Sequence, residues 1–208
     1  MPSGSPSRGL VLVPDVMGLR PLFDDLCARL AAEQGWAVCA PEPFPGHEDF
    51  TLDQRFAQMP KVTDHHRLGD ILASADVLDG HPGVERIGIL GFCMGAMYTL
   101  KATATARFDR AVAFYGMITV PEQWKGEGHG EPLAALSKPS PTKVLAIVGG
   151  RDAMTPPDDV AALRALGDRV EIAFYPEAEH GFVHDPSRPT HRADDAADAW
   201  SKAKAFLS

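Results

Sequence analysis

Short apolar runs alternate with amphipathic stretches along most of the chain. The apolar runs are of the kind expected for strands buried on both faces of a parallel sheet. They are Leu10–Val13, Ala37–Ala40, Arg86–Leu90, Arg110–Phe114, Lys143–Val148 and Val170–Tyr175. Helical patterns separate or follow them, at Pro21–Gln34, Asp64–Leu78, Cys93–Thr105, Asp158–Leu166 and Thr190–Leu207. This alternation predicts right-handed β-α-β units and a mostly parallel, doubly wound α/β sheet of about six to seven strands.

Two longer stretches interrupt this pattern. Glu42–Val62 and Met117–Pro141 are rich in proline, glycine and charged residues. Both follow expected strands at their carboxyl ends, which is the side where open α/β sheets bind ligands. We interpret them as long loops that form the walls of a substrate pocket, with Phe44, Arg55 and Trp124 as candidate lining residues. Solvated connections and ordinary aromatic packing are the alternatives.

Length, charge and cysteine content limit the functional classes. The 208 residues suffice for one domain, which we expect at residues 9–208 after a short polar tail at residues 1–8. The 28 acidic and 20 basic residues give a net charge of −8, which argues against nucleic acid or an anionic membrane as a partner. The chain start lacks the apolar core of a signal peptide, and its three cysteines are an odd number. We therefore expect a cytoplasmic protein with reduced cysteines.

The sequence Gly91-Phe92-Cys93-Met94-Gly95 follows an apolar strand and opens a helical pattern. It has the form of the nucleophile elbow of α/β-hydrolases, with cysteine at the position where serine usually stands. The elbow is a sharp, strained turn that leaves no room for Cβ atoms on the flanking residues. Cys93 is therefore a candidate nucleophile at the carboxyl edge of the sheet.

An acid and a histidine follow Cys93 in the order that α/β-hydrolases use. Asp152 comes after the strand Lys143–Val148, and His180 comes after the strand Val170–Tyr175. The carboxyl ends of parallel strands meet at one edge of a sheet, so we expect all three side chains to lie together.

The chemistry assigns a role to each residue of this predicted triad. His180 takes the proton of Cys93 and later gives it to the leaving group, while Asp152 holds the imidazole in the correct tautomer. The backbone N–H groups of Met94 and Val16 are the candidate oxyanion-hole donors. Since a thiolate is itself a good leaving group, activated esters, lactones and thioesters suit this site better than peptides.

Several motifs together resemble the dienelactone hydrolase family, also called the carboxymethylenebutenolidases, of the α/β-hydrolase superfamily. The resemblance runs from about Gly9 to Leu207 and is strongest in the cysteine elbow and in the Asp152 and His180 loops. The motifs are Gly91-Phe92-Cys93-Met94-Gly95, Gly150-Arg151-Asp152, Glu179-His180-Gly181-Phe182, Pro14-Asp15-Val16-Met17-Gly18 and Phe114-Tyr115-Gly116. The resemblance implies a Cys-His-Asp triad, an acyl-enzyme, a small ester or lactone as substrate and no cofactor. It also implies a monomer, and we expect a monomer or a weak homodimer.

The chain departs from that family pattern in three places. We expect the β-hairpin that usually precedes the first strand to be reduced or absent. The family carries a glutamate that helps to activate the nucleophile, and Asp15 stands there, so we expect Asp15 to modulate Cys93. The family uses arginines to bind a substrate carboxylate, one of them four residues after the histidine, and His184 occupies that position. Arg55 is another candidate cationic contact, and Tyr115 and His184 complete the candidate pocket residues.

Other readings remain open at this point. The substrate of the same site is a small ester or lactone, or else a thioester or another acyl group that is hydrolysed or transferred. A degenerate hydrolase with Cys93 as a redox-sensing thiol is an alternative of a different class. We expect no metal site, because the cluster His47-Glu48-Asp49 is too tightly spaced and nothing downstream completes it.

Overall fold

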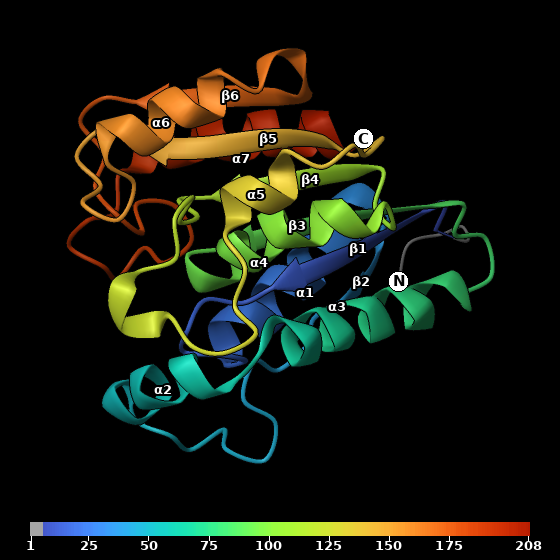
Figure 1. Ribbon diagram of the computed structural model, residues 1–208. Coiled ribbons are helices and arrows are strands. Elements are labelled where there is room, and N and C mark those ends of the chain that lie inside the picture. Colours follow the sequence, from blue (N-terminus) through green and yellow to red (C-terminus); the bar gives the residue numbers. More distant parts are fainter. Residues whose placement is uncertain (1–5) are drawn as a thin grey trace.

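The computed structural model describes residues 6–208 and contains a single sheet of six parallel strands (Figure 1). Residues 1–5 of the expected polar tail lie outside the described residues. The strand order is β2-β1-β3-β4-β5-β6, and all neighbouring pairs are parallel. The strands are β1 Arg8–Val13, β2 Ala37–Cys39, β3 Arg86–Phe92, β4 Arg110–Phe114, β5 Lys143–Gly149 and β6 Val170–Tyr175. The α/β-hydrolase fold predicted from the sequence is confirmed.

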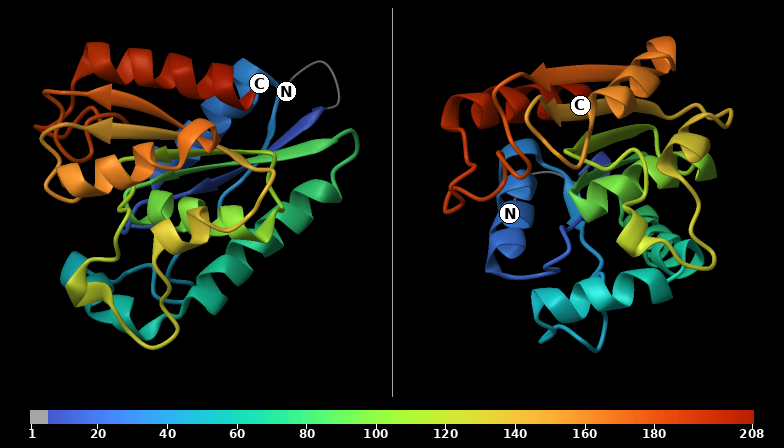
Figure 2. Two further views of the ribbon diagram at one scale, coloured as in Figure 1. Left: turned by 45° about the horizontal axis from the view of Figure 1, so that its top comes forward. Right: turned by 60° about the vertical axis from the view of Figure 1, so that its left-hand side comes forward.

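Helices cover both faces of this sheet (Figure 2). On one face, α1 (Pro21–Gln34) and α7 (Ala193–Leu207) bury their apolar stripes against the strands. On the other face lie α3 (Asp64–Asp79), α4 (Met94–Ala102), α5 (Pro132–Leu136) and α6 (Pro157–Arg164). The four central strands are almost wholly buried, whereas the edge strands β2 and β6 are partly exposed. This burial explains why the central strands are apolar at nearly every position.

The direction in which successive strands are added to the sheet reverses at β1 and β3. From β1 the chain runs outward to β2, and it then returns to β3 on the other side of β1 and continues to β6. The connections that leave β1 and β3 therefore lead to opposite faces, α1 on one and α4 on the other. Such a switch point at the carboxyl ends of the strands is where α/β sheets bind ligands.

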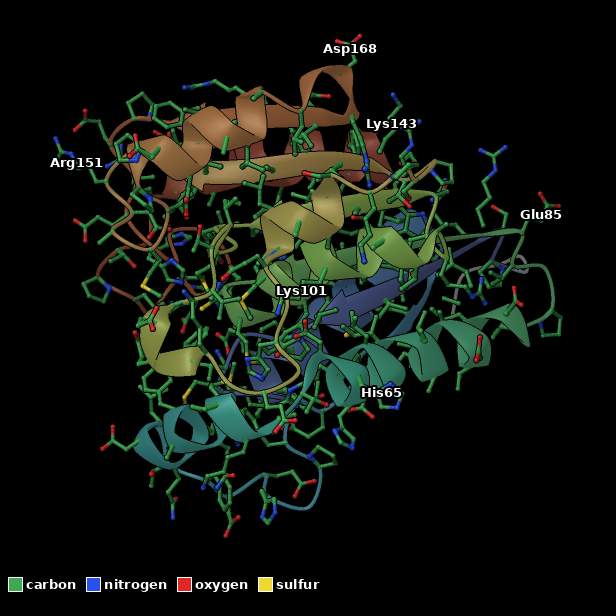
Figure 3. All side chains as sticks on the ribbon, in the orientation of Figure 1. His65, Glu85, Lys101, Lys143, Arg151 and Asp168 are labelled. Atoms are coloured by element: carbon green, nitrogen blue, oxygen red, sulfur yellow. The ribbon has the colours of Figure 1, made fainter. Side chains whose placement is uncertain are left out.

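The two ends of the sheet can be followed in Figure 3. Lys143 begins β5 and lies at the amino end, whereas Arg151 follows β5 and lies at the carboxyl end, where the candidate site is. Lys101 of α4 is an internal cation, because it is only 3% exposed and its Nζ lies 2.6 Å from Asp64 Oδ1.

The prediction of two long irregular loops was wrong in part. The first contains α2 (Leu52–Gln58) and a 3-10 turn at Met59–Lys61, and the second contains a 3-10 turn at Glu122–Trp124 and α5. Thr51 starts α2 with a reciprocal capping box in which Gln54 is the partner. Short helices of this length carry too little periodicity to stand out among prolines and glycines. Two further 3-10 turns, Thr103–Thr105 and Gly167–Arg169, follow α4 and α6.

Arg55 of α2 is only 2% exposed and stabilises the segment Glu42–Val62 from inside. Its Nε and Nη2 atoms donate to the carbonyl oxygens of Phe50 and Glu48 at 3.0 and 2.6 Å, and Nη1 lies 3.5 Å from Glu42 Oε1. Glu42 also accepts from the backbone N–H groups of Leu19 and Phe44, both at 2.8 Å. The guanidinium is thus occupied inside the protein, which corrects the expectation that Arg55 serves as a cationic substrate contact.

Replacing Arg55 with alanine should destabilise the fold, because the buried guanidinium and its bonds to Glu42 and to the carbonyl groups of Phe50 and Glu48 would be lost. Breaking a buried pair on one side costs about 3–5 kcal/mol. The matched control is Arg151→Ala, which removes the exposed pair with Glu177 and should cost less than about 1 kcal/mol. Urea unfolding at pH 7 measures both values, and equal losses in the two variants would contradict this account.

Candidate active site

Cys93 lies in a strained turn between β3 and α4. Its backbone angles are φ 53° and ψ −117°, in a region that costs a residue other than glycine about 1–3 kcal/mol. The turn is held on both sides, since the Cys93 N–H donates to the Phe114 carbonyl at 3.1 Å and the Met97 N–H donates to the Cys93 carbonyl at 3.0 Å. The side chain is half-buried at the carboxyl edge of the sheet.

The two glycines of the elbow allow backbone segments to touch. A Cβ atom on residue 95 would lie 2.2 Å from the Pro14 carbonyl oxygen and 2.3 Å from that of Val13. A Cβ atom on residue 91 would lie 2.4 Å from the Gly95 carbonyl oxygen and from Thr99 Oγ1. The turn after β1 therefore packs directly on the first turn of α4. This contact brings the carbonyl groups of Val13 and Pro14 against residue 95, two positions after Cys93.

His180 and Asp152 form a hydrogen-bonded pair next to this elbow. His180 Nδ1 donates to Asp152 Oδ2 at 2.8 Å, and Asp152 is only 4% exposed. The second carboxylate oxygen, Oδ1, accepts from the Met154 N–H at 2.8 Å. The loops that carry the pair are joined by backbone bonds, including Arg151 N–H to the Ala178 carbonyl at 2.9 Å. The sequence prediction that these two loops meet agrees with this geometry.

The surroundings of His180 favour its protonated form. Burial acts to lower the pKa of His180, but hydrogen bonds to Asp152 and Cys93, together with their charges, outweigh it and raise the pKa to about 10. The ordinary value is 6.5, so the pair stabilises the folded state fully below pH 6.5, and this contribution is lost as the pH rises through about 10. An imidazolium beside the sulfur is the form that can protonate a leaving group.

Two backbone amides remain the candidate oxyanion-hole donors. Met94 is the first residue of α4, so its N–H has no acceptor within the helix. Val16 is 7% exposed and lies in the turn that packs on the elbow. Their assignment as oxyanion donors stays a prediction.

Asp15 belongs to a second, buried polar cluster. Its carboxylate accepts two hydrogen bonds from Arg20, Nη1 to Oδ1 at 2.8 Å and Nη2 to Oδ2 at 2.9 Å. His184 Nε2 donates to Oδ2 at 2.9 Å, and the Met17 N–H donates to Oδ1 at 2.9 Å. Burial would raise the pKa of Asp15, but the bonds from His184 and Arg20 outweigh it and hold this pKa well below its usual range. Within residues 6–208, no hydrogen bond joins Asp15 to Cys93, so a direct action of Asp15 on the thiol is not what the geometry supports.

His184 is neutral in this cluster, and both of its nitrogens are in use. Burial lowers the pKa of His184 despite the neighbouring Asp15 carboxylate. With Nε2–H donating to Asp15, Nδ1 is left to accept a hydrogen bond from the Tyr115 hydroxyl. Burial, and after it the charges of Cys93 and Asp15, raise the pKa of Tyr115 well above its ordinary value, which keeps the phenol a donor.

Tyr115 links this cluster to the candidate triad. Its φ is 43°, a conformation that is unusual for a bulky residue, and its N–H donates to the Ile147 carbonyl at 2.8 Å. Its ring meets the His180 ring edge-on with the centroids 5.2 Å apart. The sequence marked Tyr115 and His184 only as pocket candidates, and it carried no signal for Arg20.

The aromatic candidates from the two long stretches are packing residues. Phe44 is 3% exposed, and the guanidiniums of Arg67 and Arg55 lie 4.3 and 5.1 Å from its ring centroid. Trp124 is 3% exposed, and its ring is 5.8 Å from that of Phe56. Neither side chain is placed to face a ligand, which corrects the expectation that they line the pocket. The physical reason is that α2 and the turn at Glu122–Trp124 pack on each other.

The described residues hold neither a cluster of metal-ligating side chains nor a helix able to cross a membrane. Among residues 6–208, no three His, Cys, Asp or Glu side chains come together as a set of metal ligands. No helix in that part of the chain is both long enough and apolar enough to span a bilayer.

Comparisons with known proteins agree with the resemblance seen in the motifs. The profile of the dienelactone hydrolase family matches residues 1–208. A protein of Escherichia coli strain K12, assigned by its name to the carboxymethylenebutenolidases, is 32% identical over 96% of this chain and 76% of its own length. A Bradyrhizobium protein, named as a probable 2-oxo-3-(5-oxofuran-2-ylidene)propanoate lactonase, is 26% identical over 95% of this chain and 82% of its own.

A crystal structure assigned to a dienelactone hydrolase of Klebsiella pneumoniae superposes with a TM-score of 0.86. It is 29% identical, and the match covers 99% of this chain and 88% of that one.

The pH dependence of turnover should report the bond between His180 and Asp152. Since the pKa of His180 is about 10, kcat/KM should fall on the alkaline side only as the pH rises through that value. Asp152→Asn removes the carboxylate that raises this pKa, so its alkaline limb should move to lower pH, with kcat/KM at pH 7 reduced about 10²–10⁴-fold.

Asp158→Asn is the control, because Asp158 is an exposed carboxylate in the first turn of α6. An alkaline limb that stays in place in Asp152→Asn would contradict the assignment of His180.

Proposed function

Because the chain belongs to the dienelactone hydrolase family, whose reaction is ester or lactone hydrolysis, we propose that it works through Cys93, His180 and Asp152 and forms an acyl-enzyme. The observation that carries this proposal is the 2.8 Å bond between His180 Nδ1 and buried Asp152, beside a cysteine held at φ 53°. A buried carboxylate, an imidazole and a sulfur in series are what a thiol hydrolase needs.

The proposed reaction has two halves. The Cys93 proton already lies on His180, whose charged form Asp152 favours, and the sulfur attacks the carbonyl carbon. The oxyanion receives hydrogen bonds from the N–H groups of Met94 and Val16. The C–O bond then breaks as His180 returns the proton to the leaving oxygen, which leaves an acyl-thioester. Water, deprotonated by His180, attacks this thioester and expels the sulfur. From a lactone the product is a single hydroxy acid, because the leaving oxygen stays attached to the acyl chain.

The substrate we propose is uncharged around its reacting carbonyl. Four residues after His180, the family's arginine is replaced by His184, which is neutral and hydrogen-bonded on both nitrogens. Arg55 is buried and occupied by Glu42 and two carbonyl groups. Neither side chain offers a free cation, so a neutral lactone or activated ester fits better than one that carries a carboxylate. The remaining cation of interest is Arg188, an exposed guanidinium that packs over Gly181.

Replacing Cys93 with alanine should abolish hydrolysis of a panel of small esters, lactones and thioesters, with a loss of at least about 10³-fold in kcat/KM. Cys27→Ala, which alters a half-buried cysteine of α1, should retain turnover. Unchanged turnover in Cys93→Ala would refute the mechanism. Rapid alkylation of Cys93 by iodoacetamide with no turnover of any ester, lactone or thioester would favour a redox-sensing role instead.

Matched substrates test the charge preference. A neutral γ-lactone should have a higher kcat/KM than the same lactone bearing a carboxylate, by about tenfold or more, because an unpaired carboxylate loses solvation in the site. If the carboxylated lactone is preferred, the proposed substrate class is wrong. The variant Arg188→Gln then shows whether that guanidinium is responsible, because the preference would disappear with it.

A further inference from the structure

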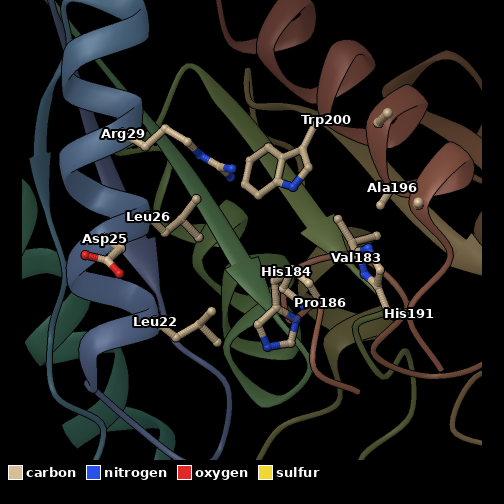
Figure 4. Close-up of a pocket in the computed structure, with 12 residues that line it drawn as sticks. Leu22, Asp25, Leu26, Arg29, Val183, His184, Pro186, His191, Ala196 and Trp200 are labelled. Atoms are coloured by element: carbon tan, nitrogen blue, oxygen red, sulfur yellow. The ribbon is translucent and has the colours of Figure 1, made fainter. Parts of the chain in front are cut away.

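A groove of about 390 Å³ runs between α1 and α7 on the face of the sheet opposite α4 (Figure 4). This volume lies within the range of about 300–1,000 Å³ that is usual for small-molecule sites. Leu22 and Leu26 of α1 and Val183 of the loop after β6 supply apolar walls, and Trp200 of α7 lines the upper part in this view. The groove is therefore mostly apolar, with a few polar groups at its border.

A single cation reaches into this groove. The Arg29 guanidinium lies 5.5 Å from the centroid of the Trp200 ring, and within residues 6–208 it forms no ion pair. Asp25 also lines the groove, but its carboxylate is turned away from Trp200 in Figure 4. Stacking on an indole ring preorders a guanidinium and leaves its N–H edge available to an acceptor. The charge in the upper part of the groove thus suits an anionic group.

A second polar atom at the groove is without a partner. Nδ1 of His191 is buried and forms no hydrogen bond within the described residues. Because this nitrogen has almost no exposed surface, a ligand in the groove does not reach it, and the contact of His191 with the groove is through the rest of its side chain.

We propose that this groove binds a small organic carboxylate with an apolar body. The carboxylate pairs with Arg29 beside Trp200, and the apolar body covers Leu22, Leu26 and Val183.

The groove is separate from the reaction site described above. His184 forms part of its wall, and both of its ring nitrogens are engaged with Asp15 and Tyr115. Tyr115 is only 1% exposed. A ligand in the groove thus touches the back of this buried cluster and does not approach Cys93. Binding there does not depend on the proposed hydrolysis.

The test uses the full chain with Cys93→Ala, so that turnover plays no part. The probe is 3-phenylpropionate, and the matched neutral probe is 3-phenylpropan-1-ol. Nitrogen-15 NMR follows the indole N–H signals of the three tryptophans in the chain, with Trp200 assigned through Trp200→Phe. The acid should shift the Trp200 signal in a saturable manner, and the alcohol should bind about tenfold more weakly.

Adding Arg29→Gln should weaken binding of the acid about tenfold and leave binding of the alcohol unchanged. Arg110→Gln is the matched control, because its guanidinium also stacks on an aromatic ring, 5.0 Å from the centroid of Phe206, but lies outside the groove. Equal affinity for acid and alcohol, unchanged binding in Arg29→Gln, or a Trp200 signal that does not move would each overturn the proposal.

Discussion

The close contact between the turn after β1 and the first turn of α4 is the constraint on which the rest of the site depends. It exists because residue 95 has no Cβ, which leaves room for the carbonyl groups of Val13 and Pro14. The same contact fixes two things at once. It holds Cys93 in a backbone conformation that the residue would not adopt alone, and it packs the turn that carries Val16 against the first turn of α4. The strain at Cys93 is thus offset by packing between two segments that are far apart in the sequence.

The polar groups at this edge form two clusters with different electrostatic character. In one, Asp152 holds His180 in its charged form, which suits proton transfer to a leaving group. In the other, burial keeps His184 neutral, and the Arg20 guanidinium pairs with the Asp15 carboxylate. Each cluster contains an aspartate bonded to a histidine. The surroundings raise the pKa of His180 and lower the pKa of His184. Tyr115 stands between them and touches both histidines.

The sequence predicted the fold and the meeting of the Asp152 and His180 loops, because each loop follows a strong apolar strand of a parallel sheet, while the role of the triad stays a prediction. It did not predict the hydrogen-bond partners of Asp15 or the burial of Arg55. Asp15 and His184 are 169 residues apart in the chain, and no local pattern links them. Arg55 looked like a loop cation because the helix that carries it is only seven residues long. Tertiary packing decides whether a charged side chain contacts a ligand or forms hydrogen bonds inside the protein.

The central claim is that Cys93 carries the acyl group during turnover. It is tested most directly by acid quench within milliseconds of mixing the protein with a neutral lactone, followed by peptide mass spectrometry. The account predicts a mass increase equal to the whole lactone on the peptide that contains Cys93, and none on the peptides with Cys27 or Cys39. Turnover without an adduct on Cys93, or an adduct on another residue, would contradict it.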